Sequence, residues 1–534
     1  MSLRRRELSA AIAGAFLPAG CGVAPSHPGP PPGTETPPSP ANAAPGTAPG
    51  VPASAPRDTP PPAPREFRAA WVATVAHIDW PSRSGLTPER QRAEALAIIE
   101  RAREIGLNAL VLQVRTAADA LYPSALEPWS EWLSGEQGRA SEPAYDPLAF
   151  WVQEAHRSGI ELHAWFNPFR ARHSSARSPL SAKHIARSQP GIVKRYGDQL
   201  WLDPGEAAAV AHTLAVVADV VKRYDIDGVH VDDYFYPYPV AQGNGGGDLP
   251  FPDEPSWKAY RDSGGTLARE DWRRENVNRF VQALQRTVRA LKPQVRVGIS
   301  PFGIGRPELR PAGIEGFSQF HRLYADVELW LANGWLDILA PQLYWPVEPA
   351  AQAFPVLLDY WHARNVQARH VWPALFTSSV AGGAKPWPAA ELLQQVALVR
   401  QRAGTQGRAP GHLHFSMNPL MQDRGGLAAR LKQGPYAQAA LVPPTPWLDD
   451  SAPAAPGLRR IDAARVQLTP GAGKPVFVWA LWRRHGASWR FATQPAAETI
   501  VELANDARLG PVELMFASAV DRLGNQGPAV VWRR

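Results

Sequence analysis

The sequence predicts an α/β protein in which a (β/α)8 barrel, the TIM-barrel fold, is followed by a small C-terminal β-sandwich. Three observations predict this. Eight short apolar runs alternate with helix-like segments over residues 66–435. Residues 458–534 carry shorter runs in which apolar and polar residues alternate between turn residues. Polar side chains also follow directly after the apolar runs of the first region, which is where a barrel holds its active site.

The predicted barrel strands are short and apolar, as expected for parallel strands that are covered on both faces. In chain order these runs are Phe67–Thr74, Ala109–Val114, Ile160–Phe166, Ile226–Asp232, Val295–Ser300, Ile338–Leu343, His370–Leu375 and His412–Ser416. A segment with helical character follows each run. In chain order these segments are 88–105, 146–158, 205–223, 270–292, 318–333, 349–364, 388–403 and 424–433.

Eight strand–helix units in series are what a closed barrel requires, and right-handed crossovers make a parallel sheet the natural assembly. An open doubly wound sheet is the competing architecture, but it does not call for eight regular units. The long segments 170–200 and 234–268 are predicted to be functional loops on the face of the barrel where the strands end.

Residues 458–534 are predicted to form a β-sandwich that resembles a fibronectin type III module. Its alternating runs include PVFVWALWRR, SWRFAT and VELMFASAVDRLGN, and Ala519–Asn525 resembles the last hairpin of such modules. Residues 436–457 are rich in Pro and Ala and are predicted to be the linker. Nothing in the sandwich supplies a cluster of carboxyl groups, so we expect it to be an accessory domain.

Residues 1–21 follow the order of a signal peptide. Arg4–Arg6 is positively charged, and Leu8–Leu17 is apolar but too short to span a membrane. The next residues end in Cys21 and resemble a bacterial lipobox, although Pro18 stands where Leu is usual. We therefore expect a lipid on Cys21, with ordinary secretion as the alternative; the paired arginines also permit twin-arginine export.

Gly22 follows the cysteine, and with no Asp there we expect a lipoprotein on the periplasmic side of the outer membrane. Residues 22–65 consist mainly of Pro, Ala, Gly, Ser and Thr, which cannot bury enough surface to fold. This segment is predicted to be an extended tether that holds the folded part away from the membrane.

The overall composition excludes several classes of function. Cys21 is the only cysteine, so neither an internal disulfide nor a cysteine-based metal site is possible. The formal net charge is +7, but the basic residues form no long block after Arg6 and accompany no nucleic-acid-binding signature. We expect no nucleic-acid partner and no cofactor. The 20 Trp residues are a composition common where the flat faces of sugars are stacked, although each one alone is better explained as core.

The segment Tyr224–Pro239, YDIDGVHVDDYFYPYP, is the most informative part of the chain. The alternation of a strand places His230 and Asp232 on one face, and Asp233 follows at the C-terminal end. A strand interior has no structural use for so many ionisable groups, because burying them is costly unless they are paired. The alternative is a structural Asp pair that caps the next loop.

The ends of the other strands carry amide, carboxylate, imidazole and aromatic groups as well, which suits carbohydrate recognition. The residues predicted to bind substrate are Asp79, Gln113, Arg115, Trp165, Asn167, His230, Tyr234, Gln342, Tyr344 and Trp345. Glycosidic cleavage needs one protonated and one ionised carboxyl group. Asp232 is expected to be the ionised partner, and Asp233 either the second group or an orienting one. Asp119 and Asp79 are the other candidates for the acid.

Several long motifs resemble the glycosyl-hydrolase-like 10 family over roughly residues 65–435. They are FRAAWVATVAHIDWPS, LQVRTAADALYPS, EPWSEWLSG, HAWFNPFR, WLDPG, YDIDGVHVDDYFYPYP, GISPFGI and LAPQLYWP. The family's Asp-Asp-Tyr motif corresponds to Asp232, Asp233 and Tyr234. The resemblance implies a secreted or lipid-anchored barrel that cleaves peptidoglycan glycan strands stripped of their peptides, with cell-division or envelope proteins as possible partners. The segment from Asp227 to Asp232 also resembles the nucleophile motif of the α-amylase superfamily, with His230 in place of Arg.

Two other functions fit parts of the same pattern. A glycan-binding lipoprotein without turnover would use the same barrel and the same aromatic residues. A metal-dependent hydrolase or deacetylase would use His230, Asp232 and Asp233 as ligands, joined by His77 and His163. Because histidines in a packed barrel are more often hydrogen-bonded core residues, we expect no metal site.

Overall fold

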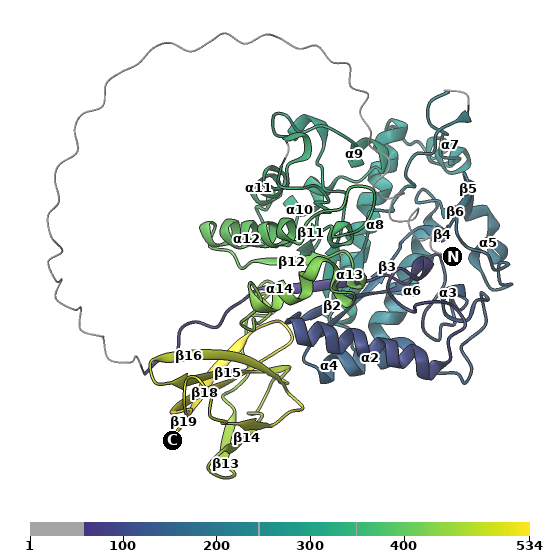
Figure 1. The fold of residues 1–534 in the computed structure, drawn as a ribbon. Helices are drawn as coiled ribbons and strands as arrows, with labels where there is room; N and C mark the ends of the chain where they lie inside the picture. The colour runs from purple at the N-terminus through teal and green to yellow at the C-terminus, as the bar shows by residue number, and fades with distance from the viewer. Residues whose placement is uncertain (1–57, 244–245, 349) are drawn as a thin grey trace, which may run out of the picture. The chain divides into compact units, whose positions relative to one another are not determined.

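The computed structural model describes residues 58–243, 246–348 and 350–534. The chain divides into two units, 1–60 and 61–534, and the second holds the barrel and the C-terminal sheets (Figure 1). The predicted signal peptide, Cys21 and nearly all of the tether lie outside the described residues. Within the described residues, no helix combines the length and apolar character needed to cross a bilayer.

The predicted barrel is confirmed. Its parallel strands are β1 (Phe67–Val72), β2 (Ala109–Arg115), β3 (Glu161–Phe166), β7 (Gly228–Val231), β8 (Arg296–Ile299), β9 (Ile338–Leu339), β10 (His370–Val371), β11 (Ala374–Leu375) and β12 (Gly411–His414). The segments β10 and β11 are two parts of the seventh strand, interrupted at Pro373, which has no N–H to donate. One part pairs with β9 and the other with β12, and β12 pairs with β1, so the sheet closes on itself.

Helices surround the barrel where the sequence predicts them, with one exception. They are α2 (Pro88–Ile105), α4 (Pro147–Arg157), α6 (Ala207–Arg223), α8 (Arg269–Leu291), α9 (Gln319–Arg322), α10 (Val327–Ala332), α11 (Phe354–Arg364), α12 (Ala389–Thr405) and α14 (Leu427–Gln433). The prediction of one helix over 318–333 is wrong: α9 and α10 are separate, because Tyr324 adopts a left-handed backbone with φ of 56°.

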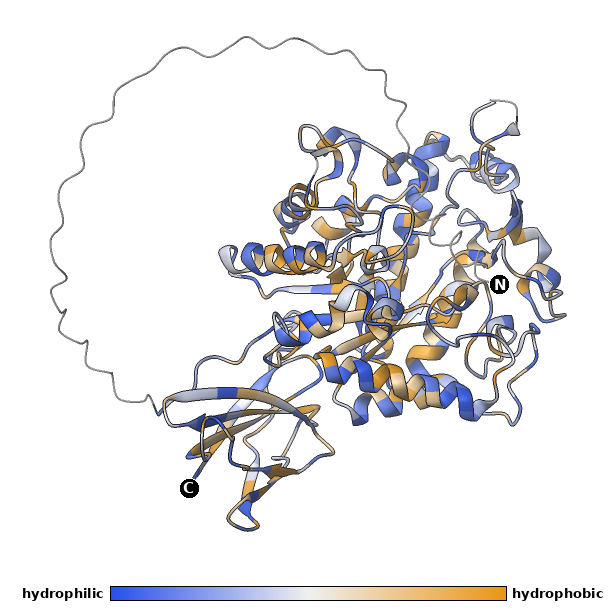
Figure 2. Ribbon diagram, viewed as in Figure 1, coloured by the Kyte–Doolittle hydropathy of each residue, from blue (hydrophilic) through white to orange (hydrophobic). Residues whose placement is uncertain are grey.

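The first of these helices illustrates why the segments fold as they do. The Thr87 side chain accepts a hydrogen bond from the Arg90 N–H, Pro88 begins the helix, and Gly106 ends it with φ of 87°. The buried residues of α2 recur every three or four positions and face the sheet. Figure 2 shows hydrophilic residues along the other side of this helix.

The two predicted loops contain secondary structure. Segment 170–200 contributes to a three-stranded sheet with the order β4 (Arg170–Arg172), β6 (Gln199–Leu202), β5 (Val193–Tyr196). Helix α5 (Ile185–Ser188) lies between β4 and β5 along the chain. Segment 234–268 contains α7 (Glu254–Asp262). Two further short helices, α3 (Glu131–Ser134) and α13 (Met417–Met421), follow the second and the eighth strand. The two predicted loops are therefore partly built from short helices and strands.

The C-terminal region is the predicted β-sandwich. One antiparallel sheet has the order β13 (Gly457–Arg460), β14 (Arg465–Thr469), β17 (Ile500–Glu502). The other has the order β16 (Ser488–Pro495), β15 (Val478–His485), β18 (Leu514–Val520), β19 (Gln526–Arg533). Residues of both sheets share one core that includes Val466, Trp479, Val501 and Met515.

Residues 436–457, predicted to be a linker, pack tightly against the barrel. Tyr436, Leu441 and Thr445 are at most 4% exposed. Leu441 exchanges main-chain hydrogen bonds with the segment that enters β1, and the Trp447 indole donates to Asp337, 2.8 Å away. This segment is therefore part of the folded unit rather than a free connection.

Two glycines inside the barrel leave space for histidine rings. A Cβ atom at Gly228 would overlap the His163 ring, and one at Gly298 would lie 2.5 Å from Cε1 of His230. We predict that Gly228→Ala lowers the free energy of unfolding by about 1–3 kcal/mol, because a packed core accommodates an added methyl group poorly. Denaturant unfolding measures this value.

Gly404→Ala is the matched control. Gly404 lies in α12, and a Cβ atom added there would have no neighbour within 4 Å. This substitution should raise the free energy of unfolding by up to about 1 kcal/mol, because Ala favours the helix. Equal effects of the two substitutions would show that the His163 ring does not need the space at Gly228.

Candidate active site

The end of β7 positions Asp232 in the mouth of the barrel. This side chain is 6% exposed. Its Oδ2 atom accepts hydrogen bonds from the Trp165 indole, at 2.9 Å, and from the Asn167 amide, at 3.0 Å. Its Oδ1 atom is buried and has no hydrogen-bond partner among the described residues. Three residues that the sequence singled out separately therefore meet at one carboxyl group.

The surroundings of Asp232 favour its protonated form. Burial, and after it the neighbouring charge of Asp233, raises the pKa of Asp232 to about 7. Arg170 and the Trp165 hydrogen bond act in the opposite direction. A carboxyl group with this pKa carries a proton in a large fraction of molecules at neutral pH, which is the property of a general acid.

Asp233 lies beside it in a different environment. The Tyr238 hydroxyl donates a hydrogen bond to its Oδ2 atom, and the Gln342 amide also lowers the pKa of this group. Burial outweighs both and keeps the pKa of Asp233 above its usual value. Because these donors stabilise its negative charge, Asp233 is better suited than Asp232 to remain ionised.

Arg170, which the sequence analysis did not select, is the cation of the site. It is 4% exposed, its guanidinium lies 4.0 Å from the centre of the Tyr234 ring, and it lowers the pKa of both Asp232 and Asp233. Its Nε atom has no hydrogen-bond partner among the described residues. Its position at the end of the HAWFNPFR motif was the only signal in the sequence.

Aromatic side chains follow the sixth strand of the barrel, and one of them, Tyr344, lies near the two carboxyl groups. Tyr344 stacks on Phe376 with 4.9 Å between ring centres, and the negative charges of Asp233 and Asp232 contribute, after burial, to raising its pKa. Trp345 packs edge-on against Phe302 at 5.5 Å. These rings offer apolar surface of the kind that the C–H faces of sugar rings contact.

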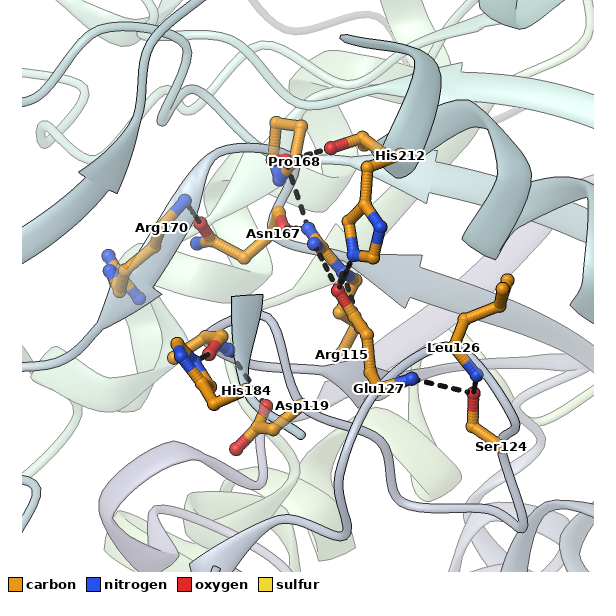
Figure 3. Close-up of polar contacts among 12 residues, drawn as sticks. Arg115, Asp119, Ser124, Leu126, Glu127, Asn167, Pro168, Arg170, His184 and His212 are labelled. Atoms are coloured by element: carbon orange, nitrogen blue, oxygen red, sulfur yellow. Dashed lines mark hydrogen bonds and ion pairs between the residues drawn. The ribbon is translucent and has the colours of Figure 1, made fainter. Parts of the chain in front are cut away.

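Arg115, predicted to bind substrate, instead holds the third strand end in place. It is completely buried, and its guanidinium pairs with Glu127 and donates to the main-chain oxygens of Asn167 and Pro168 at 2.7 and 2.9 Å (Figure 3). Burial would raise the pKa of Glu127, but Arg115 and His212 lower it to about 2. The ion pair therefore fixes the loop that carries Asn167.

Gln113 has a similar positioning role, because its Oε1 atom accepts hydrogen bonds from the Thr74 and Val75 N–H groups, each at 3.0 Å. The Nε2 atom of Gln113 is buried and has no partner among the described residues. The side chain thus joins the end of β2 to the turn that follows β1.

Asp119 and Asp79, the other predicted carboxyl candidates, bind main-chain groups. Asp119 accepts from the N–H groups of Thr116 and Ala117 and so caps its own turn. Asp79 accepts from the Ala73 N–H at 2.7 Å and from residues 416 and 418, which joins the ends of the first and eighth strands. Burial raises the pKa of Asp79 to about 6. Among the carboxyl candidates, it is the negative charge of Asp233 that raises the pKa of Asp232.

The histidines below the carboxyl pair bind each other. His230 and His163 are joined by a 3.0 Å hydrogen bond between Nε2 and Nδ1. Within the ranges described, no three His, Cys, Asp or Glu side chains are arranged to hold a metal ion. His230, Asp232 and Asp233, the ligands that the alternative metal-dependent hydrolase would use, therefore do not form such a cluster.

Comparisons with known proteins show which family the chain belongs to. Residues 66–378 match the profile of the family described as glycosyl hydrolase-like 10. The chain is 36% identical to glycosyl hydrolase YngK of Bacillus subtilis (strain 168), over 87% of this chain and 92% of that protein. It is 34% identical to glycosyl hydrolase DigH of Escherichia coli (strain K12), over 55% and 69%. The glycoside hydrolase domain of PgaB (BpsB) from Bordetella bronchiseptica aligns with a TM-score of 0.45 at 14% identity, covering 70% of this chain and 98% of that one.

Asp232 should make the native protein less stable at high pH. Its pKa of about 7 exceeds the value near 3.9 expected in the unfolded chain, so the native state binds this proton more tightly. The contribution of this proton to the free energy of unfolding is fully present below about pH 4 and is lost as the pH rises toward 7. We predict that Asp232→Asn raises the free energy of unfolding above about pH 7, by at most about 4 kcal/mol, and changes it little near pH 4.

Denaturant unfolding at both pH values measures this effect. Asp198→Asn, at an exposed position, is the matched control and should show no such pH dependence. A destabilisation by Asp232→Asn that is equal at both pH values would contradict the raised pKa.

Proposed function

Because the chain belongs to the glycosyl hydrolase-like 10 family, we propose that it is an O-glycoside hydrolase that acts on a cell-envelope polysaccharide. The observation that carries this proposal is the pair of buried, electrostatically coupled carboxyl groups, Asp232 and Asp233, at the C-terminal end of the fourth strand. Two carboxyl groups with different environments are the chemical requirement of glycosidic cleavage.

The two groups have different roles in this proposal. Asp232, whose pKa is raised to about 7, donates its proton to the oxygen of the leaving group. Asp233, which receives the Tyr238 hydrogen bond, remains ionised and either attacks the anomeric carbon or activates water. This assignment is the reverse of the sequence-based expectation, in which Asp232 was the ionised partner. The distance between the two carboxyl groups in a complex with glycan distinguishes these two routes, since retaining enzymes use about 5–5.5 Å and inverting ones about 6.5–9.5 Å.

The proposed substrate is peptidoglycan glycan freed of its peptides, as the family resemblance implies. Tyr344 and Trp345 supply apolar ring surface, and Arg170 supplies a positive charge beside the carboxyl pair. A glycan strand without peptides carries free carboxylate groups, with which an arginine pairs well. Incubating the purified protein with peptide-free and peptide-bearing strands, followed by mass spectrometry of the products, tests this choice.

We predict that Asp232→Asn lowers kcat about a hundredfold or more, because removing the general acid typically costs that much. Glycan binding should persist, since the Asn side chain can still accept from Trp165 and Asn167. Turnover on peptide-free strands and calorimetric binding measure the two effects, with Asp198→Asn as the matched control. Unchanged turnover in Asp232→Asn, or binding by the wild type with no product, would favour a glycan-binding protein instead.

We also propose that the protein is anchored to the outer membrane by a lipid on Cys21, which follows from the signal-like first 21 residues. Cys21→Ser should move the protein from the membrane fraction to the soluble fraction, because the lipid is its only proposed attachment. Cell fractionation and immunoblotting measure the change. An unaltered distribution would show that the lipobox interpretation is wrong and would favour simple secretion.

A further inference from the structure

The Tyr238 side chain is held directly against Asp233. Its hydroxyl donates a hydrogen bond to Oδ2 of Asp233. Its ring stacks on Phe317, with 5.2 Å between ring centres and 24° between ring planes, and meets Tyr234 edge-on at 5.7 Å. Burial, and after it the charge of Asp233, raises the pKa of Tyr238 well above its usual value, so the hydroxyl keeps the proton that it donates.

The main chain around Tyr238 is restricted as well. Pro237 and Pro239 flank this residue, and a proline fixes its own φ and disfavours a helical conformation of the residue before it. The N–H group of Val240 donates to the Tyr196 hydroxyl of β5 at 3.2 Å, which joins the same loop to the three-stranded sheet. The loop and the ring contacts therefore place the Tyr238 hydroxyl on Asp233 before any substrate binds.

Tyr238 is the strongest of the groups that stabilise a negative charge on Asp233. Burial raises the pKa of Asp233, and of the groups that oppose burial the Tyr238 hydroxyl comes first, followed by the Gln342 amide, the N–H group of Asp233 itself and the charge of Arg170. Nε2 of Gln342 also donates to the main-chain oxygen of Ser300 at 2.9 Å, so this amide serves two acceptors. The Tyr238 hydroxyl has a single proton, and it donates that proton to Asp233.

The donors of Asp232 leave its proton in place. Oδ2 of Asp232 accepts N–H groups from Trp165 and Asn167, whereas its Oδ1 atom has no hydrogen-bond partner among the described residues. Burial raises the pKa of Asp232, and after burial the negative charge of Asp233 raises it further. A charge that is held on Asp233 therefore keeps the proton of the pair on Asp232.

We infer that Tyr238 is a positioning residue for the reaction: its hydroxyl fixes the orientation of the Asp233 carboxylate and holds the negative charge there, which leaves the proton of the pair on Asp232. This inference rests on the proposed function, in which Asp232 is the acid and Asp233 the ionised partner. It adds the residue that decides between the two roles. The other titratable and charged groups that interact with Asp233 are Asp232, Arg170, Tyr234 and Tyr344.

Tyr238→Phe tests this role, because it removes the hydroxyl and keeps the ring that stacks on Phe317. Without this donor the ionised form of Asp233 is less stable, so the loss of its proton should move to higher pH by about one unit. The acid limb of the pH profile of kcat/KM on peptide-free strands, which reports this ionisation, should move in the same direction. We expect kcat at pH 7 to fall about tenfold with little change in KM, because a misdirected carboxylate slows only the chemical step.

Tyr236→Phe is the matched control. It removes a hydroxyl from the same segment, and the charged groups that act on that hydroxyl are Asp203, Asp253 and Arg273 rather than the two carboxyl groups of the site. Carbon-13 NMR of labelled carboxyl groups in the full protein measures the Asp233 titration in both variants. The control should leave this titration and the acid limb where they are in the wild type.

A second replacement changes the same hydrogen bond in the opposite direction. A tyrosine that carries fluorine next to its hydroxyl group, introduced at position 238, has a more acidic hydroxyl and is a stronger donor of nearly the same size. The Asp233 titration and the acid limb should then move to lower pH. A purely structural role of Tyr238 would change turnover or thermal unfolding without moving either one. If Tyr238→Phe does not fold, the sign of the shift in the fluorinated protein decides.

The two readouts separate failure of this inference from failure of the proposed function. Absence of turnover in the wild type, with the Asp233 titration raised only in Tyr238→Phe, would overturn the proposed function and retain the control of the Asp233 charge by Tyr238. An Asp233 titration that is the same in the wild type, in Tyr238→Phe and in the fluorinated protein would overturn the inference, whatever the turnover. An equal shift in Tyr236→Phe would also contradict it, because the effect would then not be specific to Tyr238.

Discussion

The burial of two adjacent carboxyl groups at the end of β7 is the constraint on which the rest of the structure depends. Removing a carboxylate from water is costly unless hydrogen bonds or opposite charges replace the water. Asp233 receives the Tyr238 hydroxyl, while Asp232 receives N–H donors on only one oxygen and has its pKa raised to about 7. The positive charge of Arg170 lowers the pKa of both carboxyl groups. In the proposed mechanism, these unequal environments make Asp232 the acid and Asp233 the ionised partner.

Hydrogen bonds and an ion pair among the neighbouring strand ends fix the groups that surround the two carboxyl groups. The Arg115–Glu127 ion pair fixes the main chain next to Asn167, and Asp79 joins the ends of the first and the last strand. Both involve main-chain groups, and the Arg115–Glu127 pair keeps its geometry because it is buried and no solvent competes. The donor groups that face Asp232 are therefore arranged before any substrate binds, which is the condition for electrostatic catalysis.

Much of the fold could be predicted from the sequence, because short apolar strands and periodic helices are local patterns. The site was only partly predictable. Asp232 and Asp233 stand out because charges interrupt an apolar strand, but the charge of Arg170 acts from a loop that strand periodicity does not describe. Arg115 and Asp232 are both charged residues at strand ends, so the sequence does not distinguish them. Their partners in the structure do: Arg115 holds Glu127 and the main chain, whereas Asp232 is the residue to which we assign a chemical role. The break at Tyr324 depends on one backbone conformation and has no periodic signal.

A crystal structure of the Asp232→Asn variant with a bound glycan oligosaccharide tests the central claim most directly. The account predicts a glycosidic oxygen within about 3.2 Å of the residue 232 side chain, with a sugar ring against Tyr344 and the Asp233 carboxylate directed toward the anomeric carbon or a water molecule beside it. A glycan bound elsewhere on the barrel, or one whose glycosidic oxygens all lie beyond the reach of both carboxyl positions, would contradict the account.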